Sequence, residues 1–401
     1  MKDLLYLAHR IPYPPNKGDK IRSYHLLQRL AEKWNVHLGA FVDDPDDWQH
    51  VSVLQDICAE TCFVGLNPSW AKVRALRGFL TGTSLTMPYY RKSELGDWVA
   101  SLADSRHIEA VVVFSSSMAQ HAESLLGGDT RSVIDFCDMD SDKWHQYSQK
   151  FGGIRRWIYG REAARLRDEE TAIARKFDAS VLISDDETRI FCEQTGTPPE
   201  RVHVVRNGVD LEYFDPGQPF NSPYREDEKP LVFVGAMDYW PNIDAVKWFA
   251  DHVFPAVREV RGDANFYVVG SNPGREVLEL GEREGITVTG RVEDVRPYLA
   301  FSLCAVAPLR VARGVQNKVL EAMAMARPVL ASDAALEGIS FTDDSGITVC
   351  NAESAWTDAL VTALDKTSVN ATVSGARRHV SEQYSWDASV QSLVDIIEAA
   401  G

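Results

Sequence analysis

The sequence lacks the patterns that mark several classes of protein. No apolar run approaches the ~20 residues that a membrane-spanning helix needs, and the opening MKDLLYLAHRIPYPP lacks the apolar segment of a signal peptide. No G-x-G-x-x-G sequence is present, so a nicotinamide dinucleotide site has no support. The six cysteines show no paired metal-ligand spacing, and we expect reduced thiols. These absences favour a cytoplasmic protein that is soluble or peripheral to a membrane.

Positive charge is also scarce. The chain has 42 Lys and Arg residues against 58 Asp and Glu residues, and the formal net charge of −16 argues against a general nucleic-acid partner. Hydrophobic residues make up 45% of the chain and charged residues 25%, as in ordinary globular proteins. Because 401 residues exceed the size of one ordinary hydrophobic core, we expect two domains.

Both halves of the chain alternate apolar runs with helical patterns, which predicts an α/β fold with two Rossmann-like, doubly wound parallel sheets. The expected strands fall at 4–8, 36–42, 110–114, 132–136, 179–183, 230–237, 264–269, 286–289, 303–307, 329–331 and 347–350. In each half the first strand leads into a proline-containing loop and then a helix, expected at 21–33 and at 243–258.

The polar stretch 215–229 is the expected linker between the two halves. We therefore predict an N-terminal domain over residues 1–214 and a C-terminal domain over residues 215–385. A last helix is expected within 386–401.

The stretch Ala305–Ser332 has the features of a ligand site. It is expected to form a strand, a loop, a helix that opens after Gly314, and a second strand. Free N–H groups at the helix start, the helix dipole and Lys318 in the first turn suit a diphosphate. Glu321, about one turn further on, can accept hydrogen bonds from ribose hydroxyls. The pattern indicates a nucleotide-sugar site; the alternative is a surface helix on which both side chains are solvated.

The same stretch resembles the signature of family 4 retaining glycosyltransferases, written E-G-F-G-x-x-x-x-E-A-M-A-x-G-x-P-V. LEAMAMARPV matches its second part and places Glu321 on the second Glu, whereas Arg313 stands where the family has its first Glu. Asn207-Gly208-Val209-Asp210, followed by F-x-P, is similar to a second hallmark of the family. The variant RGVQNKVLEAMA resembles a subgroup of sugar transferases associated with exosortase (PEP-CTERM) polysaccharide systems.

This resemblance implies the GT-B architecture, in which two Rossmann-like domains face a central cleft and the terminal helix returns to the first domain. The implied donor-binding residues are Gly235, Arg291, Gly314, Val315, Gln316, Asn317, Lys318 and Glu321. Gly18 and Arg22 of the first glycine-containing loop are expected to meet phosphate or acceptor, and Arg313 and Asp138 to act at the reacting sugar, with Asp140 as an alternative to Asp138. No cofactor and no metal ion are expected.

Asp138-Met139-Asp140 also matches the D-x-D of metal-dependent, single-domain (GT-A) glycosyltransferases. That pattern is weak, and no other feature of the chain fits the single-domain architecture.

Aromatic and basic side chains are mixed in residues 67–100 and again in residues 143–176, most densely in IRRWIYGR. Such segments suit adsorption to anionic lipid or contact with a lipid-linked acceptor. An ordinary pair of amphipathic helices in the first segment, and a solvated helix in the second, are the alternatives.

The expected function is transfer of a sugar from a nucleotide-diphosphate sugar to a polysaccharide precursor, with a glycan or lipid-linked acceptor and no nucleic acid. The expected location is the cytoplasm, with peripheral contact at the inner face of the membrane. Two alternatives stay open. One is a nucleotide-sugar epimerase of GT-B fold; the other is a non-catalytic nucleotide-sugar-binding subunit, suggested by Arg313.

Overall fold

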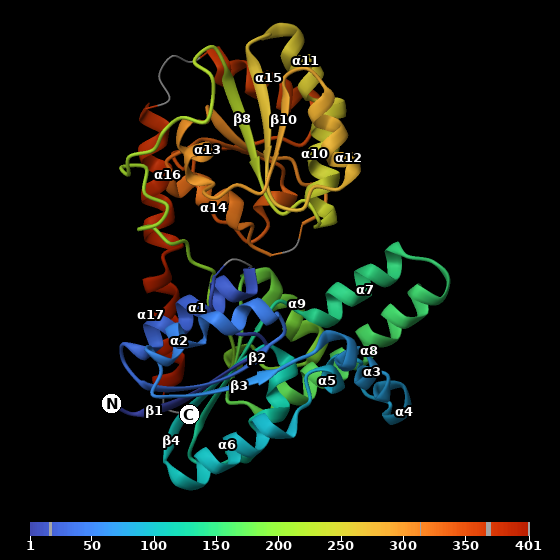
Figure 1. Ribbon diagram of the computed structural model, residues 1–401, viewed down its shortest axis with the longest axis vertical. Helices are drawn as coiled ribbons and strands as arrows, with labels where there is room; N and C mark the ends of the chain where they lie inside the picture. The colour runs from blue at the N-terminus through green and yellow to red at the C-terminus, as the bar shows by residue number, and fades with distance from the viewer. Residues whose placement is uncertain (16–17, 313, 366–369, 400–401) are drawn as a thin grey trace. The chain divides into compact units, whose positions relative to one another are not determined.

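The structure is a computed structural model that describes residues 1–15, 18–312, 314–365 and 370–399 (Figure 1). The chain forms two compact units: unit 1 is Met1–Arg206 with the residues from Ser389 onward, and unit 2 is Asn207–Ala388. The division lies eight residues before the boundary expected from the sequence. Residues 207–214 belong with unit 2 because the Val209 N–H donates to the Tyr384 carbonyl and Arg377 donates to the Leu211 and Phe214 carbonyls.

Unit 1 is built on a seven-stranded parallel sheet in the order β3-β2-β1-β4-β5-β6-β7. The strands are β1 (Asp3–Ala8), β2 (Asn35–Val42), β3 (Glu60–Gly65), β4 (Ile108–Phe114), β5 (Arg131–Cys137), β6 (Ala179–Leu182) and β7 (Val202–Val204). The central strands are continuous apolar runs because helices cover both faces of the sheet. The strand order reverses between β1 and β4, where the carboxyl ends of a doubly wound sheet leave a crevice.

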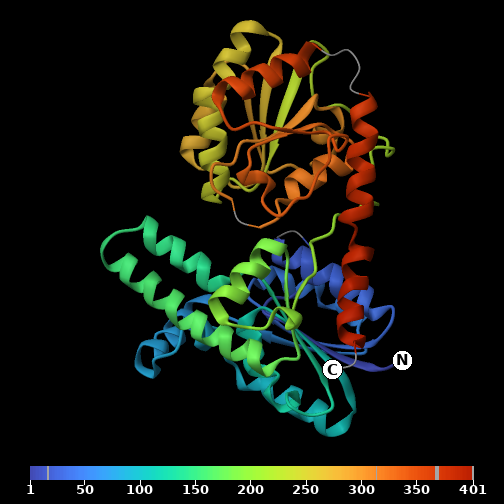
Figure 2. The ribbon, with the colours of Figure 1, turned by 180° about the vertical axis from the view of Figure 1, so that it is seen from behind.

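The helices of unit 1 include one long hairpin. The elements are α1 (Gly18–Ala31), η1 (Pro45–His50), α2 (Val51–Gln55), α3 (Pro68–Ala75), α4 (Arg77–Thr81), α5 (Thr86–Tyr89), α6 (Ser93–Ser105), η2 (Ser116–His121), η3 (Glu123–Leu125), α7 (Asp140–Lys150), α8 (Gly153–Lys176), α9 (Asp185–Thr195), η4 (Pro199–Arg201) and the later part of α17 (Trp386–Glu398). Figures 1 and 2 show α7 and α8 side by side, extending beyond the sheet. The Tyr159 ring holds the hairpin together by contacts with the rings of Trp144 and Phe151.

Two buried glutamates of α8 hold the amino ends of neighbouring helices. Glu162 accepts hydrogen bonds from the Leu85 and Thr86 N–H groups at the start of α5. Glu170 accepts from the Ser141 N–H in the first turn of α7, and burial raises the pKa of its carboxyl to about 8. The first N–H groups of a helix have no partner within the helix, so these hydrogen bonds fix the starts of α5 and α7 to α8.

Unit 2 repeats the plan with a six-stranded parallel sheet in the order β10-β9-β8-β11-β12-β13. Its elements are β8 (Lys229–Val234), α10 (Trp240–His252), α11 (Phe254–Val260), β9 (Ala264–Val269), α12 (Arg275–Leu278), η5 (Glu279–Glu282), β10 (Ile286–Gly290), α13 (Arg296–Phe301), β11 (Cys304–Ala307), α14 (Asn317–Ala324), β12 (Val329–Ala331), η6 (Ala334–Leu336), β13 (Ile347–Val349), α15 (Glu353–Asp365) and α16 (Asn370–Gln383). The single helix expected over 243–258 is two helices, because Pro255 starts α11 and cannot continue the hydrogen bonding of α10.

All six cysteines are free thiols. Burial raises the pKa of each, to about 12 for Cys58 and Cys304 and to about 11 for Cys350. Among the residues that the structure describes, no helix combines the length and the apolar character that a bilayer crossing requires.

Candidate functional site

Glycines end three neighbouring strands of unit 2 at the carboxyl edge of its sheet. They are Gly235 after β8, Gly270 after β9 and Gly290 at the end of β10. A Cβ atom on Gly270 would lie 1.7 Å from the Gly235 carbonyl oxygen, so this close approach of two backbones requires glycine. The loops that leave this edge therefore start from backbone that is packed tightly together.

Lys318, in the first turn of α14, is tied to the loop after β8. Its Nζ donates to Asn242 Oδ1 at 2.5 Å and lies 4.6 Å from the centre of the Phe233 ring. Asn242 is buried on α10 and its Nδ2 donates to the Ala236 carbonyl at 2.9 Å. A Cβ on Gly235 would lie 2.7 Å from that Nδ2, so glycine leaves room for the amide. Burial lowers the pKa of Lys318 to about 7, against the opposing charge of Glu321.

Glu321 lies about one turn further along α14 and is partly buried. Burial raises the pKa of its carboxyl to about 7, although the Lys318 charge acts the other way. Within the described ranges, no hydrogen bond or ion pair engages the Glu321 carboxylate. The carboxylate is therefore available to accept hydrogen bonds from a ligand.

A polar group that the sequence reasoning missed lies close to Glu321. Burial and the Asp294 charge raise the pKa of Tyr213, and the charge of Glu321 contributes to that rise. The Arg296 guanidinium carbon lies 3.9 Å from the centre of the Tyr213 ring, and Arg296 forms an ion pair with Asp294. Tyr213 lies between the NGVD hallmark and the F-x-P that follows it, which was the available signal for it.

The loop before α14 is shaped by its glycine. Gly314 has a φ of 64°, and its carbonyl accepts from Gln316 Nε2 at 3.1 Å. Val315 packs into the core of unit 2, whereas Asn317 Oδ1 is buried at the helix start without a hydrogen bond from the described protein atoms. Arg313 lies outside the described residues.

Arg291, another predicted donor residue, follows a strand that is not adjacent to β11. It is exposed after β10, which is separated from β11 by β9 and β8. No hydrogen bond or ion pair joins Arg291 to Lys318 or Glu321 among the side chains that the structure describes.

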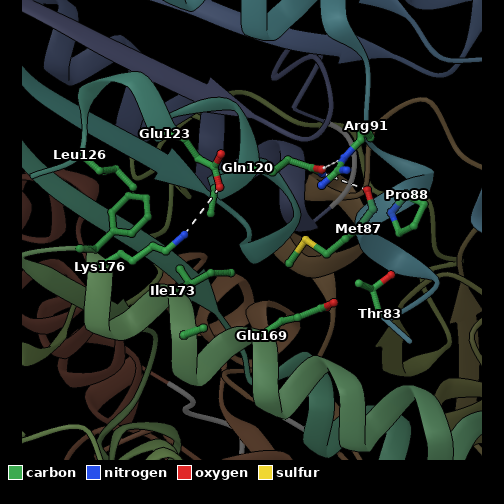
Figure 3. Close-up of a pocket in the computed structure, with 13 residues that line it drawn as sticks. Thr83, Met87, Pro88, Arg91, Gln120, Glu123, Leu126, Glu169, Ile173 and Lys176 are labelled. Atoms are coloured by element: carbon green, nitrogen blue, oxygen red, sulfur yellow. Dashed lines mark hydrogen bonds and ion pairs between the residues drawn. The ribbon is translucent and has the colours of Figure 1, made fainter. Parts of the chain in front are cut away.

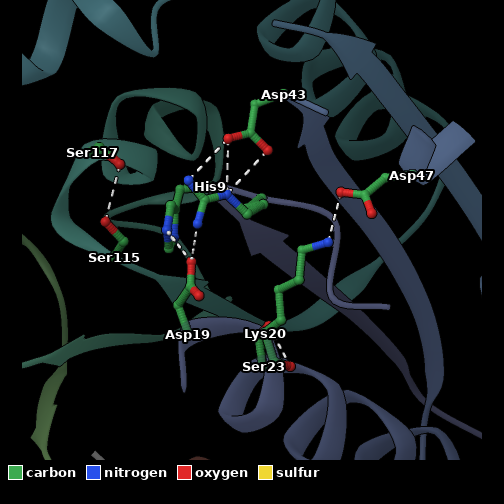
Figure 4. Close-up of polar contacts among 9 residues, drawn as sticks. His9, Asp19, Lys20, Ser23, Asp43, Asp47, Ser115 and Ser117 are labelled. Atoms are coloured by element: carbon green, nitrogen blue, oxygen red, sulfur yellow. Dashed lines mark hydrogen bonds and ion pairs between the residues drawn. The ribbon is translucent and has the colours of Figure 1, made fainter. Parts of the chain in front are cut away.

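Unit 1 carries a second polar group at the carboxyl edge of its own sheet (Figure 4). Arg10, after β1, binds Asp19 at 2.7 Å and Asp43 at 2.9 Å. His9 Nε2 lies 3.3 Å from Asp19. Burial alone would raise the pKa of Asp19, but the hydrogen bond and charge of His9 and the charge of Arg10 lower it well below its usual range. The sequence reasoning missed this cluster, although two polar residues directly after a buried strand were a signal.

The predicted residues Gly18 and Arg22 lie on α1 beside this cluster in the chain. Gly18 is the first residue of the helix, and apart from its chain neighbours and its own helix backbone no heavy atom of the described residues lies within 4 Å of where its Cβ would be. Arg22 is buried, and its Nε donates to the buried Asp135 Oδ2 at 2.9 Å. Lys20, also buried, forms a 2.6 Å ion pair with Asp47.

Asp138 follows a residue with unusual backbone geometry. Cys137 has a φ of 62°, and its N–H donates to Asp135 Oδ1 at 3.0 Å. Asp138 itself is exposed, yet desolvation by the surrounding protein, followed by the like charge of Asp140, raises the pKa of its carboxyl to about 6. In the described parts of the chain no three His, Cys, Asp or Glu side chains are grouped so that they could hold a metal ion.

Unit 1 also contains a cavity of about 220 Å³ between α5, η2–η3 and the later turns of α8 (Figure 3). Its lining is mostly apolar and includes Met87, Pro88, Leu126, Ile173 and Phe177. The sequence did not indicate this cavity, because its walls come from three separate stretches of chain.

The protein-family match of this chain lies in unit 2. Residues 228–366 match the family model described as glycosyl transferases group 1. This segment contains α14 with Lys318 and Glu321, α10 with Asn242, and all six strands of the unit 2 sheet.

Curated relatives match a little more than half of the chain. A D-inositol 3-phosphate glycosyltransferase from Xylanimonas cellulosilytica is 26% identical over 260 residues, which is 59% of this chain and 60% of the relative. An uncharacterised glycosyltransferase, MJ1607 of Methanocaldococcus jannaschii, is 29% identical over 240 residues, 55% of this chain and 60% of that one. The chain thus spans about three fifths of the length of these relatives.

Solved structures match the whole chain at low identity. HepE of Anabaena in complex with UDP has a TM-score of 0.67 at 13% identity, covering 100% of both chains. WaaG, a glycosyltransferase involved in lipopolysaccharide biosynthesis, has a TM-score of 0.66 at 18% identity, covering 99% of this chain and 100% of WaaG. The chain therefore has the GT-B fold predicted from its sequence, and its residues 228–366 are similar to the group 1 glycosyltransferases.

Proposed function

We propose that the protein is a retaining glycosyltransferase that moves a sugar from a nucleotide-diphosphate sugar to a polysaccharide precursor. The observation that carries the proposal is the placement of Lys318 and Glu321 on α14, within the group 1 segment. Both side chains lie at the carboxyl edge of a parallel sheet, where α/β proteins bind nucleotides.

Each group has a defined part in this proposal. The free N–H groups at the start of α14 and the Lys318 ammonium bind the diphosphate and stabilise the charge that develops on the leaving phosphate. Burial makes Lys318 easy to deprotonate when the site is empty, and an arriving anion favours its charged form. Glu321 accepts hydrogen bonds from the ribose hydroxyls. As the family resemblance implies, the leaving phosphate itself accepts the proton of the acceptor hydroxyl.

The identities of the donor and of the acceptor are a further part of this proposal. HepE of Anabaena was solved with UDP and with UDP-glucose, which makes uridine diphosphate sugars the first donors to test. The RGVQNKVLEAMA run supports a polysaccharide precursor of the exosortase-associated type, carried on a lipid at the cytoplasmic face of a membrane. Unit 1 is the proposed acceptor-binding part.

Mass spectrometry of products from a panel of nucleotide sugars, with and without a lipid-linked acceptor, tests the activity. A transferase gives a glycosylated acceptor and free nucleoside diphosphate. An isomerised nucleotide sugar would instead show an epimerase, and binding without any product would show a binding subunit. Glu321→Ala is expected to lose turnover, whereas Glu259→Ala, an exposed glutamate of the same unit, is expected to keep it.

We also propose that the transfer needs no metal ion, because Lys318 and the helix N–H groups already face the diphosphate position. Turnover is expected to be the same in EDTA and in manganese. Activity that disappears in EDTA and returns with manganese would contradict this proposal. It would instead favour Asp138 and Asp140 as metal ligands.

A further inference from the structure

One side of unit 1 exposes large apolar side chains from two stretches of the chain. They belong to α3, α4 and the α7–α8 hairpin: Trp70, Val73, Leu76, Phe79, Leu80, Phe151, Ile154 and Trp157. Leu80 is 89% exposed and Ile154 is 74% exposed. Single exposed apolar side chains are ordinary, but a continuous patch of them marks an interaction site.

The two stretches form one continuous surface. The rings of Phe79 and Trp157 stack with their centres 6.0 Å apart. Arg161 donates to the Gly78 carbonyl at 2.6 Å and to the Thr83 carbonyl at 3.0 Å, and its guanidinium covers the Phe79 ring at 4.8 Å. These contacts fix α4 to the first turns of α8, so the exposed side chains are held in place together. We call the exposed residues of 68–83 and 143–161 the basic apolar face.

The basic apolar face has a charge opposite to that of the whole chain. Residues 68–83 and 143–161 contain no aspartate or glutamate, although the chain has 58 of them. They contain eight Lys and Arg residues: Lys72, Arg74, Arg77, Lys143, Lys150, Arg155, Arg156 and Arg161. In a protein with a net charge of −16, this separation of charge concentrates positive potential around the exposed apolar groups.

We propose that the basic apolar face docks the protein onto the surface of an anionic lipid bilayer. Ile154 and Trp157 are three residues apart on α8 and therefore share a side of the helix. Apolar and tryptophan side chains favour the boundary between headgroups and acyl chains, and neighbouring cations bind anionic headgroups. Arg155 and Arg156 lie directly between these two apolar residues in the chain.

A second copy of the chain fits this face less well than a bilayer does. In a two-fold symmetric dimer the same surface is used by both partners, so the arginines of one copy would face those of the other. Like charges at an interface weaken association. An anionic bilayer supplies both the opposite charge and an apolar layer for Leu80 and Ile154.

Sedimentation with vesicles of phosphatidylcholine, with and without phosphatidylglycerol, tests the proposal on the full chain. The protein is expected to bind only the vesicles that contain phosphatidylglycerol, and less at high salt. Because a basic residue near such a surface contributes about 1 kcal/mol, Arg155→Gln with Arg156→Gln should lower the partition coefficient about thirtyfold. Leu80→Ser with Ile154→Ser should lower it on the order of tenfold or more.

Val260→Ser with Leu278→Ser is the matched control, because these exposed apolar residues lie in unit 2. The control should bind vesicles like the wild type, and all variants should keep their circular dichroism and their UDP affinity. Equal vesicle binding by the arginine variant and the wild type would overturn the proposal. Absence of binding to anionic vesicles, or a dimer in light scattering that Leu80→Ser with Ile154→Ser abolishes, would also overturn it. No sugar donor is present, so the result is independent of the proposed transferase activity.

Discussion

The nucleotide site proposed at Lys318 and Glu321 is unfavourable while it is empty. Burial moves the pKa of both groups to about 7, the lysine downward and the glutamate upward. Each group is therefore held partly in its neutral form by its surroundings. A diphosphate beside Lys318 and ribose hydroxyls beside Glu321 would favour the charged forms. Burial of these two groups therefore lowers the folding stability of the ligand-free protein, and bound nucleotide would offset that loss.

Glu321→Ala should weaken the binding of a nucleoside diphosphate. Loss of hydrogen bonds to a charged group costs roughly 1.5–3 kcal/mol, or about ten- to a hundredfold in affinity. Titration calorimetry with UDP measures the change, and Glu259→Ala provides the matched comparison because that glutamate is exposed on α11. Unchanged affinity in Glu321→Ala would show that the nucleotide does not lie on α14.

Lys318→Met should make the empty protein more stable near neutral pH. The folded-state pKa of about 7 lies below the ordinary value of 10.5. The cost of burying the ammonium is therefore fully present below pH 7 and declines as the pH rises toward 10.5. The melting temperature of the variant should exceed that of the wild type by a few degrees at pH 7, and by less at pH 9.5.

A surface lysine serves as the control for this pH dependence. Lys247 is paired with Glu276 at the surface, and Lys247→Met should change the melting temperature little at either pH. A Lys318→Met variant less stable than the wild type at pH 7 would mean that the hydrogen bond to Asn242 outweighs the cost of burial.

At the scale of the element, α14 ends in a turn whose geometry suits glycine. The Arg327 N–H donates to the Ala322 carbonyl and the Ala326 N–H donates to the Met323 carbonyl, which is the Schellman arrangement. Ala326, the residue that reverses the chain, has a φ of 55°. A side chain in this left-handed region costs roughly 1–2 kcal/mol. The turn directs the chain from α14 into β12.

Ala326→Gly should stabilise the protein by about 0.5–1 kcal/mol, since relief of the left-handed strain exceeds the added entropy of the unfolded chain. Urea unfolding measures this change. Ala324→Gly, in ordinary helical backbone two residues earlier, should have the opposite effect of about 1 kcal/mol. If both variants are destabilised alike, the turn at Ala326 carries no strain.

The buried strands were the most predictable elements. Continuous apolar runs marked β1, β2, β4 and β9 to within one or two residues, because a strand covered on both faces must be apolar throughout. Two strands at sheet edges were missed. β3 begins with two polar residues and is mostly only partly buried, and β7 has three residues. The pair of helices that was the alternative interpretation of residues 67–100 is instead four helices, α3 to α6, in part because Gly82 turns left-handed and ends α4.

The site was predictable where one short stretch of sequence contains it. Lys318 and Glu321 follow from the sequence of α14 alone. The Asn242 amide that holds Lys318 could not be predicted, because the contact depends on β8 lying next to β11 in the sheet. Strand order is a property of the whole fold, and no local pattern encodes it. The pairing of Arg22 with Asp135, 113 residues apart, was hidden for the same reason.

At the scale of the whole molecule, the two units have separate hydrophobic cores. The core of unit 2 runs from Val209 to Tyr384, and a core around α6 and α9 in unit 1 runs from Leu5 to Val202. A protein with two cores can unfold in two steps. The two units are therefore expected to respond separately to a ligand that binds only one of them.

Scanning calorimetry with UDP tests this expectation. A ligand at one hundred times its dissociation constant stabilises the form that binds it by about 2.7 kcal/mol. If the nucleotide binds unit 2, one of two unfolding transitions should move to higher temperature while the other stays in place. Glu321→Ala should reduce the shift. A single transition that moves as a whole would show that the units unfold together.

The protonated state of the thiols has a practical consequence for measuring movement between the units. Maleimide reacts with the thiolate, and burial holds the pKa of all six native thiols high, so these cysteines should label slowly at neutral pH. New cysteines at exposed positions such as Gln149 and Glu259 should label first, one in each unit. A pair of fluorescent dyes could then be attached without first replacing the native cysteines, and energy transfer between the dyes would report how the distance between the units changes when a nucleotide sugar binds.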